Sequence, residues 1–164
     1  VCGDGFDAMF GPAYKGIPLV TTTSASLARN YGLDKPFFFN RKEEKDHGEG
    51  GSIVGYKLKD GDRVVITEDV ITAGTAVRET LPVLKAAGDV TVAALIISVD
   101  RMERGQGEKS AVQEIYENYG IKTYPIVTVR EIIEALYNTP VDGKIYIDDA
   151  MKEKMEAYLA QYGV

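Results

Sequence analysis

The chain has 164 residues, with 19 lysines and arginines against 25 aspartates and glutamates, so its formal net charge is −6 at pH 7. This acidic balance argues against a dedicated binder of duplex nucleic acid, which needs a basic face to displace counterions, and no apolar run approaches the roughly 20 residues of a membrane span. The single cysteine, Cys2, excludes an internal disulfide framework and favours a reducing compartment, so we expect a cytoplasmic protein.

Apolar segments typical of strands alternate with segments of helical periodicity along the whole chain. Strands are predicted at 6–10, 36–39, 63–67, 90–99 and 123–128, and helices at about 16–31, 75–87, 108–119, 129–137 and 148–162. The side chains expected on the buried faces of the first three helices are Ile17, Val20, Leu27, Ala28 and Tyr31, then Val77, Leu81 and Leu84, then Val112, Ile115, Tyr116 and Tyr119. Pro82 should kink the second helix or open its hydrogen bonding. The alternation predicts an α/β fold, with a mostly parallel central sheet flanked by helices, in a single domain over residues 1–164.

The carboxyl ends of the predicted strands are the expected place of a ligand site. In parallel sheets these ends meet at one edge, and ligands bind in the crevice beyond it. The residues that follow Phe10, Phe39, Ile66 and Val99 should therefore face one site. These junctions also carry the most unusual chemistry of the chain.

The segment after the most apolar strand has the chemistry of a phosphate site. Thr72-Ala73-Gly74-Thr75 offers two hydroxyls, a glycine and the unpaired N–H groups of a helix N-terminus, which together form a phosphate cradle. Glu68 and Asp69 lie just before it and suit paired hydroxyls, such as a ribose diol, or a metal-bound water. The segment is neither a P-loop nor a Rossmann fingerprint, since both of those glycine patterns are absent. Taken singly, the acids would be solvated loop residues and Thr75 a helix cap.

The segment from Arg41 to Ser52 combines charges of both signs with several glycines. Four potential cations fall within seven residues: Arg41, Lys42, Lys45 and His47. The glycines make this segment too flexible for a strand, so a mobile lid over a site is a natural interpretation. A solvated, disordered loop is the alternative on charge pattern alone.

Arg101 follows the predicted strand that ends near Val99, where its planar guanidinium suits a carboxylate ligand. The alternative is an ordinary salt bridge with Asp100, Glu103 or another nearby acid. Arg104 has no comparable claim to a ligand.

Four segments of the chain resemble a known enzyme family. Residues 65–75 resemble the binding motif for phosphoribosyl pyrophosphate (PRPP) of the type I phosphoribosyltransferases. Residues 10–18, 40–51 and 98–105 resemble the orotate phosphoribosyltransferase branch of that family, in the family's order. The resemblance implies transfer of the 5-phosphoribosyl group from PRPP to orotate, which forms orotidine 5′-monophosphate and releases pyrophosphate in de novo pyrimidine (UMP) biosynthesis. Because a highly charged group departs, this catalysis needs cations, a held ribose and exclusion of water.

The resemblance also implies a role for each matching residue. PRPP binding is implied for Tyr14, Lys15, Arg41, Lys42, Lys45, His47, Glu68, Asp69, Val70, Ile71, Thr72, Ala73, Gly74, Thr75 and Ala76. Catalytic roles are implied for Lys45, His47 and Asp69, with Lys45 as the principal catalytic cation, and orotate binding for Thr72 and Arg101. Mg²⁺ is the expected cofactor, held mainly through PRPP and without direct protein ligands. The loop at 41–52 is expected to reach a neighbouring subunit's site, which implies a homodimer with shared active sites.

Two departures from the family pattern bear on function. The first acid of the pair is Glu68, where this branch usually has aspartate, and one extra methylene shifts a ribose contact by about an ångström. Only Val1 to Met9 precede the first matching segment, whereas the family has a leading segment that contributes a hood over the base, so this hood is expected to be largely absent. Two alternatives follow. One is a catalytically weak PRPP- or nucleotide-binding fragment or regulatory module, and the other is a phosphoribosyltransferase for another base.

Overall fold

The central element of the fold is a six-stranded sheet. The computed structural model describes residues 5–41, 53–71 and 75–164, apart from the side chains of Thr75 and Ala76. The strands are β1 (Ala8–Gly11), β2 (Phe37–Asn40), β3 (Ile53–Gly55), β4 (Arg63–Val70), β5 (Thr91–Asp100) and β6 (Thr123–Thr128), in the spatial order β3-β2-β1-β4-β5-β6. Neighbouring strands are parallel, except that β3 is antiparallel to β2. The predicted α/β fold with a mostly parallel sheet is therefore confirmed.

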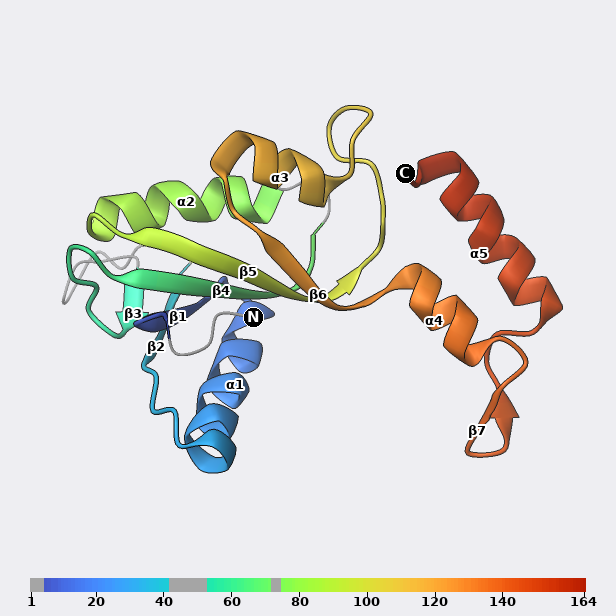
Figure 1. The fold of residues 1–164 in the computed structure, drawn as a ribbon, viewed down its shortest axis with the longest axis horizontal. Coiled ribbons are helices and arrows are strands. Elements are labelled where there is room, and N and C mark those ends of the chain that lie inside the picture. Colours follow the sequence, from blue (N-terminus) through green and yellow to red (C-terminus); the bar gives the residue numbers. More distant parts are fainter. Residues whose placement is uncertain (1–4, 42–52, 72–74) are drawn as a thin grey trace.

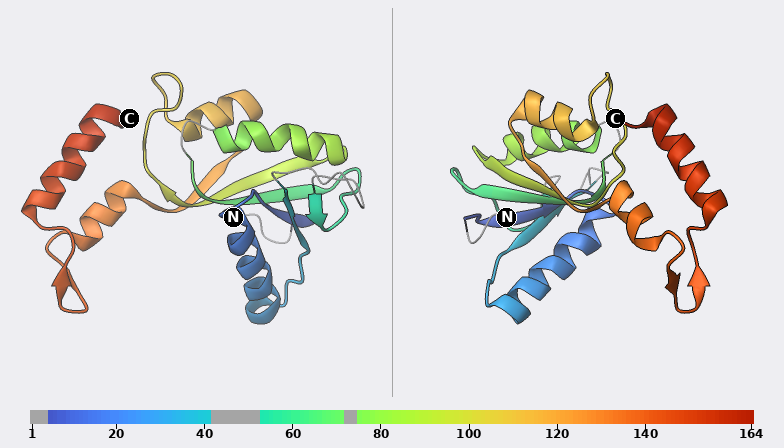
Figure 2. Two further views of the ribbon diagram at one scale, coloured as in Figure 1. Left: turned by 180° about the vertical axis from the view of Figure 1, so that it is seen from behind. Right: turned by 45° about the vertical axis from the view of Figure 1, so that its right-hand side comes forward.

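Helices cover both faces of this sheet (Figure 1). They are α1 (Gly16–Tyr31), α2 (Thr75–Ala87), α3 (Ala111–Tyr119), α4 (Val129–Leu136) and α5 (Asp149–Tyr162), and a hairpin of β7 (Pro140–Val141) and β8 (Lys144–Ile145) joins the last two. α2 and α3 lie on one face and α1 on the other, while α4, the hairpin and α5 extend away from β6 (Figures 1 and 2). The end of α5 returns toward the loop that follows β5. None of the described helices is both long enough and apolar enough to cross a membrane.

The alternation of side chains along the strands builds one core on each face of the sheet. Phe10, Ile66 and Leu95 belong to the core that includes residues of α2 and α3, and the ring of Phe10 lies 4.9 Å from that of Phe38. Their immediate neighbours Met9, Val65 and Ala94 form the other core with Val20 of α1. Strands buried on both faces read as continuous apolar runs, which is why the sequence revealed them.

Local capping residues set the helix ends. α1 ends where Gly32 adopts a left-handed conformation with φ of 67°, as glycine does without steric cost. α3 begins at Ala111, three residues later than predicted from about Glu108, because Ser110 and Gln113 form a reciprocal capping box. α2 spans the predicted residues and continues past Pro82.

Four residues predicted on buried helix faces are exposed: Ala28, Tyr31, Tyr116 and Tyr119. The far end of α1 extends beyond the sheet (Figure 1), which leaves the Tyr31 side chain 73% exposed. A tyrosine has an apolar ring and a polar hydroxyl, so it is also stable at a partly exposed position of a helix. Its place in an apolar helical pattern therefore does not show that it is buried. The prediction for the three tyrosines was wrong for that reason, and the prediction for Ala28 was wrong because it lies at the same exposed end of α1 as Tyr31.

In the outer strand β6, the backbone N–H and carbonyl groups of successive residues face alternately toward β5 and toward the free edge of the sheet. The Leu95 N–H donates to the Lys122 carbonyl at 3.0 Å, and Pro125 pairs in register with Ile97. Since the backbone groups of successive residues face opposite edges of a strand, the nitrogen of Pro125 faces outward, away from β5. The Ile126 side chain is 78% exposed.

Candidate functional site

The loop between β1 and α1 is closed by two glycines. A Cβ on Gly11 would lie 2.2 Å from the Gly16 carbonyl oxygen, and one on Gly16 would lie 2.8 Å from the Gly11 carbonyl carbon, so neither position has room for a side chain. The Ala13 N–H donates to Asn40 Oδ1 at 2.9 Å, which ties this loop to the end of β2. The peptide bond before Tyr14 is cis. The tight loop leaves the Tyr14 and Lys15 side chains 63% and 76% exposed at the carboxyl edge of the sheet.

A pair of acidic residues lies at the same edge of the sheet, near the carboxyl end of β4. Glu68 and Asp69 belong to the strand rather than to a loop after it, because pairing with β5 continues as far as Val70 opposite Val99. The sequence-based limit of the strand at Thr67 was therefore too short. The Asp69 N–H donates to Glu68 Oε1 at 3.0 Å, and Lys15 Nζ lies 2.6 Å from Asp69 Oδ2. These contacts bring Lys15, Glu68 and Asp69 together across 54 residues of sequence.

The two carboxyls have different electrostatic environments. Desolvation raises the pKa of Glu68 from its ordinary value of 4.5 to about 7, and the neighbouring Asp69 adds to this rise. Partial burial also acts to raise the pKa of Asp69, but hydrogen bonds from Lys15 and from the Val70 N–H outweigh it, so this pKa lies below its ordinary range. The hydrogen bond to Asp69 raises the pKa of Lys15. At neutral pH the site therefore holds an ionised Asp69 beside a carboxyl that is readily protonated.

Glu68 should make the stability of the protein fall as the pH rises toward neutrality. Its pKa is higher in the folded chain, so between about pH 4.5 and about pH 7 the folded state binds more protons than the unfolded state. The free energy of unfolding of the wild type, minus that of Glu68→Gln, should decrease across this interval and stay constant above it. Urea unfolding at several pH values measures this difference. A difference that is the same at pH 5 and pH 8 would show that Glu68 titrates normally.

Arg101 begins the loop after β5 and contacts two side chains. Its Nη2 lies 2.5 Å from Glu103 Oε1 and donates to the Tyr158 hydroxyl at 3.2 Å, and that hydroxyl donates to Glu103 Oε1 at 2.7 Å. The alternative of a salt bridge between Arg101 and Glu103 is thus realised in this structure. The Arg101 side chain remains 40% exposed, so it is still accessible to a ligand.

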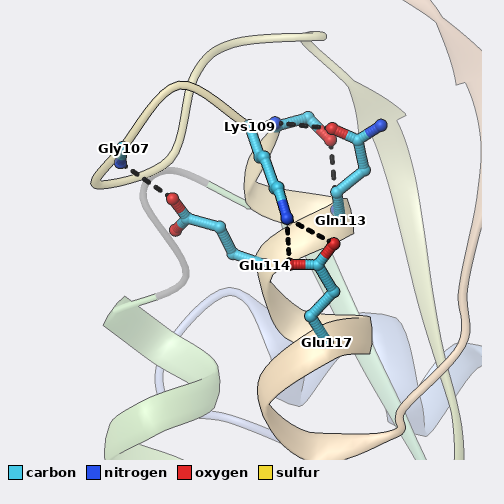
Figure 3. A network of polar contacts seen from close by, with 6 residues as sticks. Gly107, Lys109, Gln113, Glu114 and Glu117 are labelled. Atoms are coloured by element: carbon cyan, nitrogen blue, oxygen red, sulfur yellow. Dashed lines mark hydrogen bonds and ion pairs between the residues drawn. The ribbon is translucent and has the colours of Figure 1, made fainter.

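The rest of this loop is held on α3 by a network that Figure 3 shows. The Glu114 carboxylate accepts the Gln106 and Gly107 N–H groups at 3.0 and 2.8 Å. Lys109 Nζ contacts both carboxylate oxygens of Glu117 at 2.7 and 2.6 Å. These contacts fix the course of the chain from β5 to α3.

The predicted site residues fall into three groups. Tyr14, Lys15, Arg41, Glu68, Asp69, Val70 and Arg101 lie at or just beyond the carboxyl ends of β1, β2, β4 and β5, and the buried Ile71 follows β4. Thr75 and Ala76 open α2, as predicted. Lys42, Lys45, His47, Thr72, Ala73 and Gly74 lie outside the described residues, as does most of the predicted lid at 41–52.

Three residues that support the site were not predicted from the sequence. Asn40 ends a strand, and an asparagine there commonly bonds the backbone of a neighbouring loop, so its position was a weak signal. Glu103 was considered only as an alternative partner of Arg101. Tyr158 is 57 residues from Arg101 in the sequence, and no local pattern connects the two.

The donor set fits a magnesium ion only in part. Among residues 5–41, 53–71 and 75–164, no three histidine, cysteine or acidic side chains gather into a metal site. Glu68 and Asp69 supply carboxylate oxygens, which Mg²⁺ prefers, but Asp69 is already paired with Lys15. This set suits an ion that takes most of its ligands from a bound substrate.

Comparisons with known proteins agree with the geometry. The model of the phosphoribosyl transferase domain family matches residues 3–130. The chain is 55% identical over 162 residues to an orotate phosphoribosyltransferase of Lachnoclostridium phytofermentans, covering 99% of this chain and 72% of the relative. It is 56% identical over 160 residues to the corresponding protein of Clostridium beijerinckii, covering 98% of this chain and 71% of the relative.

A solved structure shows the same likeness in three dimensions. The crystal structure of an orotate phosphoribosyltransferase from Francisella tularensis superposes with a TM-score of 0.76 at 33% sequence identity. The match covers 97% of this chain and 71% of that one. The likeness therefore includes α4, the hairpin and α5 as well as the sheet.

Proposed function

The chain belongs to the orotate phosphoribosyltransferase family, and from this we propose that it transfers the 5-phosphoribosyl group of PRPP to orotate. The products are orotidine 5′-monophosphate and pyrophosphate, a step of pyrimidine biosynthesis. We propose that residues 1–164 act as one core domain in this reaction. The observation that carries the proposal is the juxtaposition of Lys15, Glu68 and Asp69 at the carboxyl edge of the sheet.

This juxtaposition suits a sugar that carries a diphosphate. Asp69 is ionised and accepts hydrogen bonds, as a ribose hydroxyl requires, and Glu68 lies beside it for the second hydroxyl. Lys15 is exposed on a flexible stem, so its ammonium group moves from Asp69 to the diphosphate when the ribose arrives. The pair thus keeps a cation next to the place where negative charge develops.

The neighbouring segments complete the proposed PRPP site. Tyr14 contacts PRPP near its diphosphate, and the run from Val70 to Ala76 holds the 5′-phosphate on the N-terminus of α2. Arg41, Lys42, Lys45 and His47 belong to a lid that closes over the diphosphate, with Lys45 as the main catalytic cation and His47 as a hydrogen-bond or proton donor. Their charge pattern and the family membership support these roles.

The base site uses the loop after β5. Arg101 binds the acidic base through its guanidinium, and Thr72 lies near the same base. The pairing of Val70 with Val99 supports this, because it brings the ends of β4 and β5 to one edge.

Three further features belong to the proposal. Mg²⁺ would be held mainly through the diphosphate and ribose oxygens of PRPP, where it would neutralise charge on the leaving group. The enzyme is a homodimer in which the loop at 41–52 reaches the partner's site. The activity is cytoplasmic, in keeping with the single cysteine.

A direct assay tests the proposed function. Orotate should lose its characteristic absorbance when PRPP and Mg²⁺ are present, and adenine or hypoxanthine should not be consumed under the same conditions. Consumption of a purine base without consumption of orotate would contradict the assignment of the base.

Arg101→Ala should raise the KM for orotate by about 10- to 100-fold, because a charge-assisted hydrogen bond to the substrate is lost. The KM for PRPP should change by less than about twofold, since the described contacts of Arg101 are with Glu103 and Tyr158 rather than with the acid pair. Steady-state kinetics with each substrate varied in turn measures both constants. Arg29→Ala is the matched control, because Arg29 lies in the last turn of α1 and is exposed. An unchanged KM for orotate would remove Arg101 from the base site.

A further inference from the structure

The loop that carries Arg101 is joined to the last helix of the chain. Glu103 forms an antiparallel bridge with Gly163, and the Arg104 N–H donates to the Tyr162 carbonyl at 2.9 Å. The Val164 N–H donates to the Met102 carbonyl at 3.0 Å, and Arg104 Nε donates to the Gly163 carbonyl at 3.1 Å. The end of α5 is therefore docked on this loop mainly through main-chain groups, with one contribution from the Arg104 side chain.

The docking brings one side chain of α5 to the guanidinium of Arg101. The Tyr158 hydroxyl accepts a hydrogen bond from Arg101 Nη2 at 3.2 Å and donates to Glu103 Oε1 at 2.7 Å. Glu103 also contacts Nη2 directly at 2.5 Å, so the three polar groups form a closed triangle. The Glu103 side chain is only 14% exposed, whereas that of Arg101 is 40% exposed.

The triangle restrains Arg101 from one side only. Both contacts use Nη2, and no other described residue engages Nη1 or Nε. An arginine side chain held at one nitrogen loses much less rotamer freedom when a ligand binds the others. The arrangement thus presents the remaining donors in a fixed direction.

We propose that Tyr158 and Glu103 are positioning residues that hold Arg101 for the acidic base, so that α5 takes part in base recognition. This inference rests on the proposed function, because it requires that Arg101 binds the base. It assigns α5 a role in substrate affinity.

Tyr158→Phe tests the inference because it removes a hydroxyl and keeps the ring. The docking of α5 should survive, since it is made mainly by main-chain groups and the ring still lies against Tyr162 at 4.7 Å between centroids. We expect the KM for orotate to rise by about threefold to tenfold, the usual net effect of losing one hydrogen bond. The kcat and the KM for PRPP should stay within about twofold of the wild type.

Tyr162→Phe is the matched control, one turn along the same helix. No hydrogen bond of its hydroxyl to another described residue is present, so the KM for orotate should not change. The thermal midpoints of both variants should match that of the wild type. This comparison separates a loss of positioning from a general loosening of α5.

A double-mutant cycle makes the test specific to Arg101. In an Arg101→Ala background, Tyr158→Phe should have no further effect on the KM for orotate. Equal effects in both backgrounds, or an unchanged KM in the single variant, would overturn the inference. A wild-type protein that consumes no orotate would overturn the proposed function itself, and with it the inference.

Glu103→Gln tests the second positioning residue. It keeps an oxygen acceptor in place and removes the charge that attracts Arg101, so the KM for orotate should rise by about threefold to tenfold. A lower KM would show that Glu103 competes with the base for Arg101, and would contradict its positioning role.

Discussion

Asp69→Asn should lower kcat/KM for PRPP by roughly 10³-fold, the upper range for the loss of one electrostatic contact to a developing charge. The asparagine keeps the shape of the side chain but removes the negative charge that Lys15 contacts at 2.6 Å. It also replaces a carboxylate acceptor for a ribose hydroxyl by a weaker amide oxygen. Steady-state kinetics with PRPP varied, at saturating orotate, measures the effect.

The control for this variant is Asp142→Asn. Asp142 is an exposed acid in the β7–β8 hairpin, and its φ of 50° is one that asparagine adopts as readily as aspartate. Both variants change the net charge equally, so a general electrostatic effect would appear in both. A loss for Asp69→Asn that is confined to the KM for orotate would contradict a role at the ribose.

Phe10→Ala should lower the free energy of unfolding by about 3–5 kcal/mol, through lost burial and the cavity left behind. The Phe10 side chain is fully buried, and its ring packs at 4.9 Å from that of Phe38 on the adjacent strand. Urea unfolding monitored by circular dichroism measures the change.

Tyr31→Ala provides the comparison for the loss of an aromatic ring. Tyr31 is 73% exposed at the end of α1, so its removal should change the free energy of unfolding by no more than about 0.5 kcal/mol. Similar losses for both variants would mean that Phe10 does not sit in a tightly packed core.

The fold was predictable where local chemistry determines it. The buried strands were readable because they are apolar on both faces, and α1 ends at Tyr31 because Gly32 stops it. The hairpin of β7 and β8 was missed because each of its strands has two residues and no buried face. The end of β4 was placed too early because its last residues are acidic, and only pairing with β5 keeps them in the strand.

The site was predictable only in its motif residues. Glu68 and Asp69 could be named because two acids that follow a buried strand and precede a phosphate-cradle segment are unusual, whereas Lys15 was named from the family resemblance of residues 10–18. The 2.6 Å contact between Lys15 and Asp69 could not be predicted, because it depends on the register in which β1 pairs with β4. The same is true of Tyr158, which reaches Arg101 only because the chain turns back after the hairpin.

The proline in the outer strand limits how this sheet can associate with other chains. An exposed strand edge can pair with a strand of another chain, and the exposed apolar side chain of Ile126 would favour this pairing. Pro125 has no N–H to offer at that edge, so one carbonyl group of an incoming strand would have no hydrogen-bond donor. Pro125 therefore disfavours edge-to-edge association of this sheet with other chains.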